Sequence, residues 1–158
     1  MEENELKTFL KKQAELEQRI VDMVEENTKQ LDNILIKELL RGIGYDSLKH
    51  KNMLLSLLAL LESKTPLISE TVSNKLVEGI REHIKMEEEA IRTYSELLEK
   101  TDDEHVKLII GYILEDERRH HALLKKIEKT IIEKQTLSEK DLFELVYYYS
   151  VSHGTPGG

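Results

Sequence analysis

The chain has 158 residues, a formal net charge of −8 and no cysteine. The acidic balance argues against nucleic acid as a main partner, and the lack of cysteine excludes disulfides, zinc-finger sites and thiolate chemistry. The first residues are acidic and lack a signal-peptide core, and no apolar run reaches about 18 residues. We therefore expect a soluble cytoplasmic protein with no membrane partner.

Helix breakers are scarce, with only two prolines and seven glycines in the chain. Apolar residues recur at helical spacing. This periodicity predicts four long helices, over about residues 3–28, 32–62, 70–100 and 104–134. Asp32 is the expected N-cap of the second helix. The segment 101–104 (Thr-Asp-Asp-Glu) resembles a capping box that starts the fourth.

Two segments interrupt or end this helical pattern. Residues 63–69 are too long for a tight hairpin, and we expect them to cross most of the length of a helical bundle. A shorter fifth helix begins near Ser138. The predicted organisation is a bundle over 1–134, a C-terminal helix over 135–152 and a flexible tail over 153–158. Tyr147, Tyr148 and Tyr149 would cap the bundle or form a subunit contact, as in a homodimer.

The two halves of the chain align with each other when one is shifted by 70 residues. Glu17 then matches Glu87 (87 − 17 = 70), and His50 matches His120 (120 − 50 = 70). The apolar positions match as well, as in the pairs Ile36 with Val106 and Ile43 with Ile113. Each half therefore reads as an αα-hairpin with a Glu in its first helix and a His in its second. The predicted fold is all-α, a four-helix bundle of two hairpins joined by a crossover, plus the short C-terminal helix.

Polar residues interrupt the apolar faces of the predicted helices. Glu117 and His120 form an E-x-x-H, whose two side chains lie on one helix face about 5–6 Å apart. The complete set is Glu17, Ser47, His50, Glu87, Glu117 and His120. Three carboxylates cannot share a dry core uncompensated, because like charges a few ångströms apart repel. Divalent iron or manganese would compensate them, since both metals accept oxygen and nitrogen ligands.

This pattern resembles the ferritin-like di-iron carboxylate superfamily, nearest the rubrerythrin-like and small ferritin-like proteins. That superfamily carries a Glu on each of two helices and an E-x-x-H on each of the other two. The resemblance covers about residues 6–131. It implies terminal carboxylates at Glu17 and Glu87, imidazole ligands at His50 and His120, and a bridging carboxylate at Glu117.

Ser47 departs from the pattern, because it stands where the first E-x-x-H would carry its Glu. The site would hold one negative charge fewer, so the second ion would bind weakly, exchange, or be replaced by water. Asp46 cannot substitute, since it lies about 100° round the helix. The resemblance implies instead that Asp46 orients His120 and that Asp116 orients His50.

Two functional interpretations follow. In the first, the protein binds two iron (or manganese) ions and handles O2 or H2O2, or oxidises Fe(II), with electrons from a separate donor. Glu117 would bridge the ions, while Glu17 or Glu87 would move to open a coordination position. In the second, the buried acids and histidines pair with each other in a metal-free bundle that serves as a structural or interaction module. In both, His83, His105 and His121 are expected on the surface or flanks.

Overall fold

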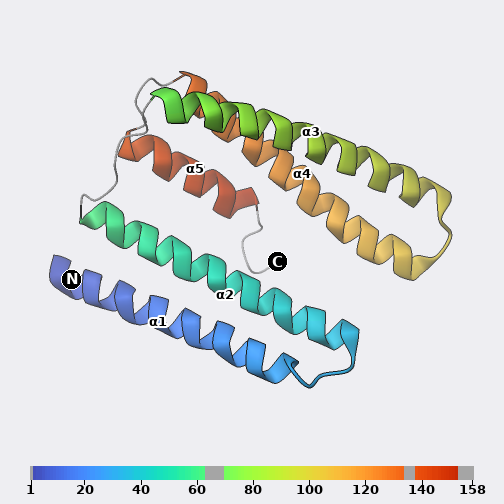
Figure 1. Ribbon diagram of the computed structural model, residues 1–158, viewed down its shortest axis with the longest axis horizontal. Helices are drawn as coiled ribbons and strands as arrows, with labels where there is room; N and C mark the ends of the chain where they lie inside the picture. The colour runs from blue at the N-terminus through green and yellow to red at the C-terminus, as the bar shows by residue number, and fades with distance from the viewer. Residues whose placement is uncertain (1, 63–69, 134–137, 153–158) are drawn as a thin grey trace. The chain divides into compact units, whose positions relative to one another are not determined.

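The computed structural model describes residues 2–62, 70–133 and 138–152 (Figure 1). It contains the helices α1 (Glu3–Thr28), α2 (Ile34–Leu61), α3 (Glu70–Lys100), α4 (Glu104–Glu133) and α5 (Glu139–Ser152). The described ranges contain no strand. The predicted all-α class, with four long helices and a short fifth, is therefore confirmed. The expected crossover at 63–69 and the tail at 153–158 lie outside the described residues.

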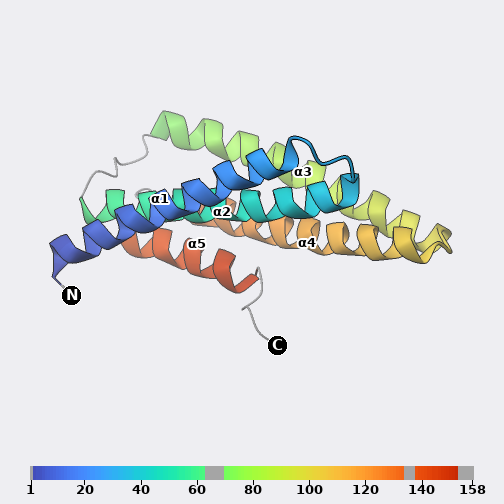
Figure 2. The same ribbon diagram turned by 90° about the horizontal axis from the view of Figure 1, so that it is seen from below.

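The helices group into two compact units, Met1–Pro66 and Leu67–Gly158. In the first unit α1 packs against α2, and in the second α3 packs against α4, while α5 contacts α4. Both views show each pair as an antiparallel hairpin (Figures 1 and 2). We call them the first and second hairpins. None of the described helices is long and apolar enough to cross a membrane.

The first residue of α2 differs from the prediction. The helix begins at Ile34, and Asn33 is its N-cap, with the side-chain Oδ1 accepting a hydrogen bond from the Ile36 N–H at 3.0 Å. Asp32 was expected in this role. Both residue types cap helices well, and the one that caps is the one whose side chain reaches the free N–H groups of the first turn.

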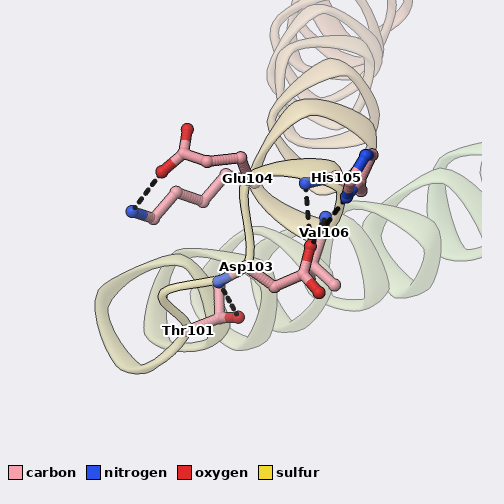
Figure 3. Close-up of polar contacts among 6 residues, drawn as sticks. Thr101, Asp103, Glu104, His105 and Val106 are labelled. Atoms are coloured by element: carbon pink, nitrogen blue, oxygen red, sulfur yellow. Dashed lines mark hydrogen bonds and ion pairs between the residues drawn. The ribbon is translucent and has the colours of Figure 1, made fainter.

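The start of α4 is capped by one acid (Figure 3). Asp103 Oδ1 accepts hydrogen bonds from the N–H groups of His105 at 2.8 Å and Val106 at 3.2 Å. These backbone hydrogen bonds, Val106 first, hold the pKa of Asp103 below its usual value. Thr101 accepts from the Asp103 N–H at 3.3 Å. Asp103 is therefore the N-cap in place of Thr101, and Glu104 pairs with Lys107 rather than with the Thr101 backbone.

The fifth helix is anchored by reciprocal hydrogen bonds at its first turn. The backbone N–H and the hydroxyl of Ser138 donate to Asp141 Oδ2 at 2.8 and 2.6 Å, and the Asp141 N–H donates to the Ser138 hydroxyl at 3.3 Å. Asp141 is buried. The predicted start of this helix near Ser138 agrees with this arrangement.

The core of the second hairpin leads directly to the candidate site. Its buried cluster consists of Val77, Ile80, Ile84 and Ile131, with Leu124 and Ile127 packed against it. The three residues from α3 recur every three or four positions, so they form one face of the helix. One turn further along the same face lies Glu87, which is also buried. Glu87, Glu88 and Glu89 are consecutive, and the apolar stripe determines that Glu87 is the one that points inward.

The predicted apolar face of α2 is buried only in part within the first hairpin. Gly44 and Ser47 are buried, whereas Ile36 and Ile43, predicted on the apolar seam, are 49% and 54% exposed. Ser47 lies on the predicted seam and Gly44 lies one residue beside it, after Ile43, so the buried positions of α2 follow that seam only in part. Apolar residues lie on most sides of this helix, so its sequence does not single out one face.

Candidate metal centre

Three of the predicted ligands converge in the second hairpin. Glu87 comes from α3, and Glu117 and His120 come from α4. One ligand atom of each lies within 4.8 Å of the others. The E-x-x-H spacing places Glu117 and His120 one turn apart on α4, and the antiparallel packing brings Glu87 opposite them. We call this group the triad.

Glu87 is the buried member of the triad, with 6% of its surface exposed. Its Oε2 is buried and has no hydrogen-bond donor among the described residues. Burial, the largest cause, and the facing carboxylate of Glu117 together raise the pKa of Glu87 to about 7, against the opposing effect of His83. The metal-free site therefore accommodates a proton between the two acids near neutral pH. A cation would replace that proton and supply the missing partner of Oε2.

His83 contacts the triad, although the sequence placed it on a flank. It lies one turn before Glu87 on α3, and its Nε2 is 2.9 Å from Glu87 Oε1. The imidazole is 56% exposed, so it links the buried carboxylate to the surface. The i, i+4 spacing between His83 and Glu87 is the sequence feature that could have indicated this contact. The spacing alone does not tell a ligand-orienting histidine from a surface residue.

A second histidine fastens the two helices beside the triad. His121 Nε2 lies 3.1 Å from Glu88 Oε1, which joins α4 to α3. Further along, Arg81 donates to Glu128 at 2.6 Å across the same pair of helices. His121 was expected only to be a flanking residue. These cross-helix contacts hold α3 and α4 in the register that the triad requires.

The first hairpin offers two of the predicted ligands. Glu17 Oε1 lies 3.5 Å from His50 Nδ1, so α1 and α2 bring an acid and an imidazole together. Ser47, one turn before His50, is buried. Its hydroxyl carries no charge and cannot stand in for a bridging carboxylate. Among the residues described in this hairpin, no third acid or histidine joins the pair into a metal-binding group.

Each of the two predicted orienting acids has a partner on its own helix. Asp46 pairs with Lys49 at 2.6 Å, and Asp116 pairs with Arg119. The predicted contacts from Asp46 to His120 and from Asp116 to His50 would join the two hairpins and stay predictions.

The donor set of the triad suits iron or manganese. Two carboxylates and one imidazole, without sulfur, match the ligand preferences of both metals. The buried Oε2 of Glu87 is a polar atom that a cation would satisfy and that solvent does not reach. The residues present therefore fit the metal group inferred from the sequence.

Comparison with models of protein families places most of the chain in a known family. A family model described as Rubrerythrin matches residues 15–128, which is more than half of the chain. The matched range contains the candidate ligands of both hairpins, from Glu17 to His120. Neither the curated proteins nor the solved structures gave a significant match.

Proposed function

Because the chain belongs to the rubrerythrin family, within the ferritin-like di-iron carboxylate superfamily, we propose that it is a non-haem iron or manganese protein. Its reaction would be the reduction of O2 or H2O2, or the oxidation of Fe(II). The observation that carries this proposal is the convergence of Glu87, Glu117 and His120 around a buried carboxylate oxygen that has no hydrogen-bond donor among the described residues.

The side chains of the triad have distinct roles in this proposal. Glu87 and Glu117 hold one proton between them in the metal-free protein and release it when a cation enters. His120 offers a ring nitrogen, and His83 holds one oxygen of Glu87 so that the other faces the cation. The bound metal would supply the redox chemistry. The apolar cluster below Glu87 keeps water from that side of the site.

The two hairpins would contribute unequally. The second hairpin brings three ligands together by itself, whereas the first offers Glu17 and His50 and has Ser47 in place of a carboxylate. We therefore expect one ion to bind first and tightly to the triad. A second ion, held by Glu17 and His50 with Glu117 as the bridge, would bind more weakly.

Electrons for this chemistry would come from a separate donor protein. The chain contains no cysteine, so it has no thiolate-bound iron site of its own. We place the reaction in the cytoplasm on the composition alone.

One observation favours a second function, that of a metal-free interaction module. The pairs Glu17–His50 and His83–Glu87 partly satisfy the acids without any cation. In that case the polar residues would specify helix register rather than bind metal.

Metal titration separates the two functions. We expect the purified protein to bind Mn(II) or anaerobic Fe(II), with its melting temperature raised because the ion binds only the folded state. Glu117→Ala should abolish tight binding, and Ser47→Glu should tighten the second equivalent. Glu115→Ala is the matched control, because Glu115 is exposed on the same helix and pairs only with Arg118 among the described residues. Absence of binding and an unchanged melting temperature would support the interaction module.

A further inference from the structure

A groove of about 630 Å³ lies between α1 and α2 of the first hairpin. Its volume is within the range of small-molecule sites in proteins. It is lined by Val21, Val24, Glu25, Thr28, Lys29, Lys37, Arg41, Gly44, Tyr45 and Leu48. All of these residues belong to the first hairpin, and the candidate metal ligands are not among them. The groove is therefore separate from the metal centre.

The floor of the groove is apolar because two helices approach closely there. Gly44 is buried, and a Cβ atom added to it would lie 3.1 Å from Val24 Cγ1. Val21 and Leu48 extend the apolar lining away from this point. Thr28 directs its hydroxyl into the helix, where it donates to the Val24 carbonyl at 2.8 Å. This floor offers contact to hydrocarbon and few hydrogen-bonding groups.

The cations of the groove gather at one end. Lys29 follows the last residue of α1, and Lys37 and Arg41 lie on the first two turns of α2, so all three are near the turn that joins the helices. Glu25 is the single acid of the lining. The lining therefore carries a surplus of positive charge in a protein whose net charge is −8. A negatively charged group would be attracted to this end.

These cations differ in how far they are already neutralised. Lys29 pairs with Glu26 at 2.6 Å, and Arg41 pairs with Glu38 at 2.6 Å, each within its own helix segment. Lys37 has no ion-pair partner among the described residues. The ammonium of Lys37 and the partly neutralised guanidinium of Arg41 together suit a ligand with one negative charge better than a ligand with two.

The internal repeat shows that the fold does not require this groove. Under the 70-residue shift, Gly44 corresponds to Leu114 and Val24 to Tyr94. Leu114 is buried in the second hairpin, so larger side chains stand there in place of Gly44 and Val24. The groove is thus a particular feature of the first hairpin.

The same 70-residue shift shows which cations of the groove have a basic equivalent in the second hairpin. Lys29 corresponds to Glu99 and Arg41 to Gly111 in the second hairpin. Neither equivalent residue is basic. Lys37 corresponds to Lys107, so the second hairpin keeps one of the three cations. The Gly44–Val24 floor and the full set of three cations therefore occur together in the first hairpin, whereas the second hairpin has neither.

We propose that this groove binds a small amphipathic monoanion, a carboxylate that carries a short hydrocarbon chain. The carboxylate lies between Lys37 and Arg41, where it accepts charge-assisted hydrogen bonds. The hydrocarbon chain lies along Val21 and Leu48, away from the turn. This site is independent of the metal function proposed above, because no candidate metal ligand lines it.

The test uses the full-length, metal-free protein labelled with ¹⁵N and titrated with sodium octanoate. Amide shifts should concentrate on the lining residues of α1 and α2 and saturate. Octanol has a chain of equal length without the charge, and acetate has the charge without the chain. Both should bind at least about tenfold more weakly. Shifts spread over both hairpins, or equal binding of octanol, would overturn the proposal.

Two sets of variants locate the site. Lys37→Gln with Arg41→Gln should weaken octanoate binding at least about tenfold, whereas Lys125→Gln with Lys126→Gln, which makes the same charge change on exposed residues of α4, should not. Gly44→Leu combined with Val24→Ala fills the floor and should abolish binding. If that variant does not fold, the charge variants decide the question alone. Octanoate affinity that is unchanged in Lys37→Gln with Arg41→Gln would exclude the groove.

Discussion

Replacement of Glu87 by Gln removes the buried ionisable member of the triad while keeping its shape. The pKa of Glu87 is raised from 4.5 to about 7 in the folded protein, chiefly by burial. A group whose pKa is raised on folding favours the folded state fully below the unfolded-state pKa, and that contribution is lost as the pH rises through the folded-state pKa. The metal-free protein should therefore lose stability between about pH 4.5 and pH 7.

The size of this loss of stability follows from the difference between the two pKa values of Glu87. Each pKa unit corresponds to 1.36 kcal/mol, so the full effect of Glu87 is about 3 kcal/mol at pH well above 7. Gln cannot ionise and does not experience this loss. We expect the free energy of unfolding of Glu87→Gln, relative to the natural sequence, to increase by about 2–3 kcal/mol from pH 5 to pH 8.

The assay is urea unfolding of both proteins in EDTA at several pH values. Glu89→Gln is the control, because Glu89 is exposed on the same helix and should give no such pH-dependent difference. With saturating Mn(II) at pH 8, the natural sequence should have the larger free energy of unfolding of the two proteins, since Glu87 then carries its charge beside a cation. A difference between Glu87→Gln and the natural sequence that does not change with pH would refute the reasoning.

Three further predictions concern other contacts. Asp103→Ala should lower the free energy of unfolding at pH 7 in urea unfolding, with a smaller loss below the lowered pKa of Asp103, because the side chain accepts its two backbone hydrogen bonds more strongly when it is ionised. His83→Ala should weaken Mn(II) binding about tenfold in calorimetric titration without unfolding the protein, because Glu87 loses the imidazole that orients it. An unchanged affinity would mean that His83 does not orient Glu87 for metal binding. Gly42→Ala should raise the melting temperature, since no atom of the described residues lies within 4 Å of the added Cβ and Ala is favoured in helices by about 1 kcal/mol. Gly44→Ala should raise it less or lower it, because its Cβ meets a Val side chain at 3.1 Å.

Much of the helical structure was predictable from the sequence, for identifiable reasons. Breakers are rare, and acids or amides stand before the helices that follow short turns. The stripe that ends at Ile84 also selected Glu87 over Glu88 and Glu89, which are exposed. The start of α2 was less certain, because Asp32 and Asn33 are adjacent and both are good cap residues.

Other features depended on information that periodicity does not contain. The face of α2 that packs against α1 could not be read from a helix with apolar residues on most sides, which is why Ile36 and Ile43 were misplaced. The contact of His83 with Glu87 depends on the side-chain conformations of both residues. The groove depends on Gly44 and Val24 meeting across two helices, and only the packed hairpin shows that meeting.

The position of the triad has a consequence for how the protein acquires its structure. All three residues lie within the continuous stretch 87–120, on two helices joined by a turn of a few residues. Closing so short a loop costs little chain entropy, and contacts that are local in sequence form early. The ligands can therefore come together in a nascent hairpin before distant parts of the chain have found their partners.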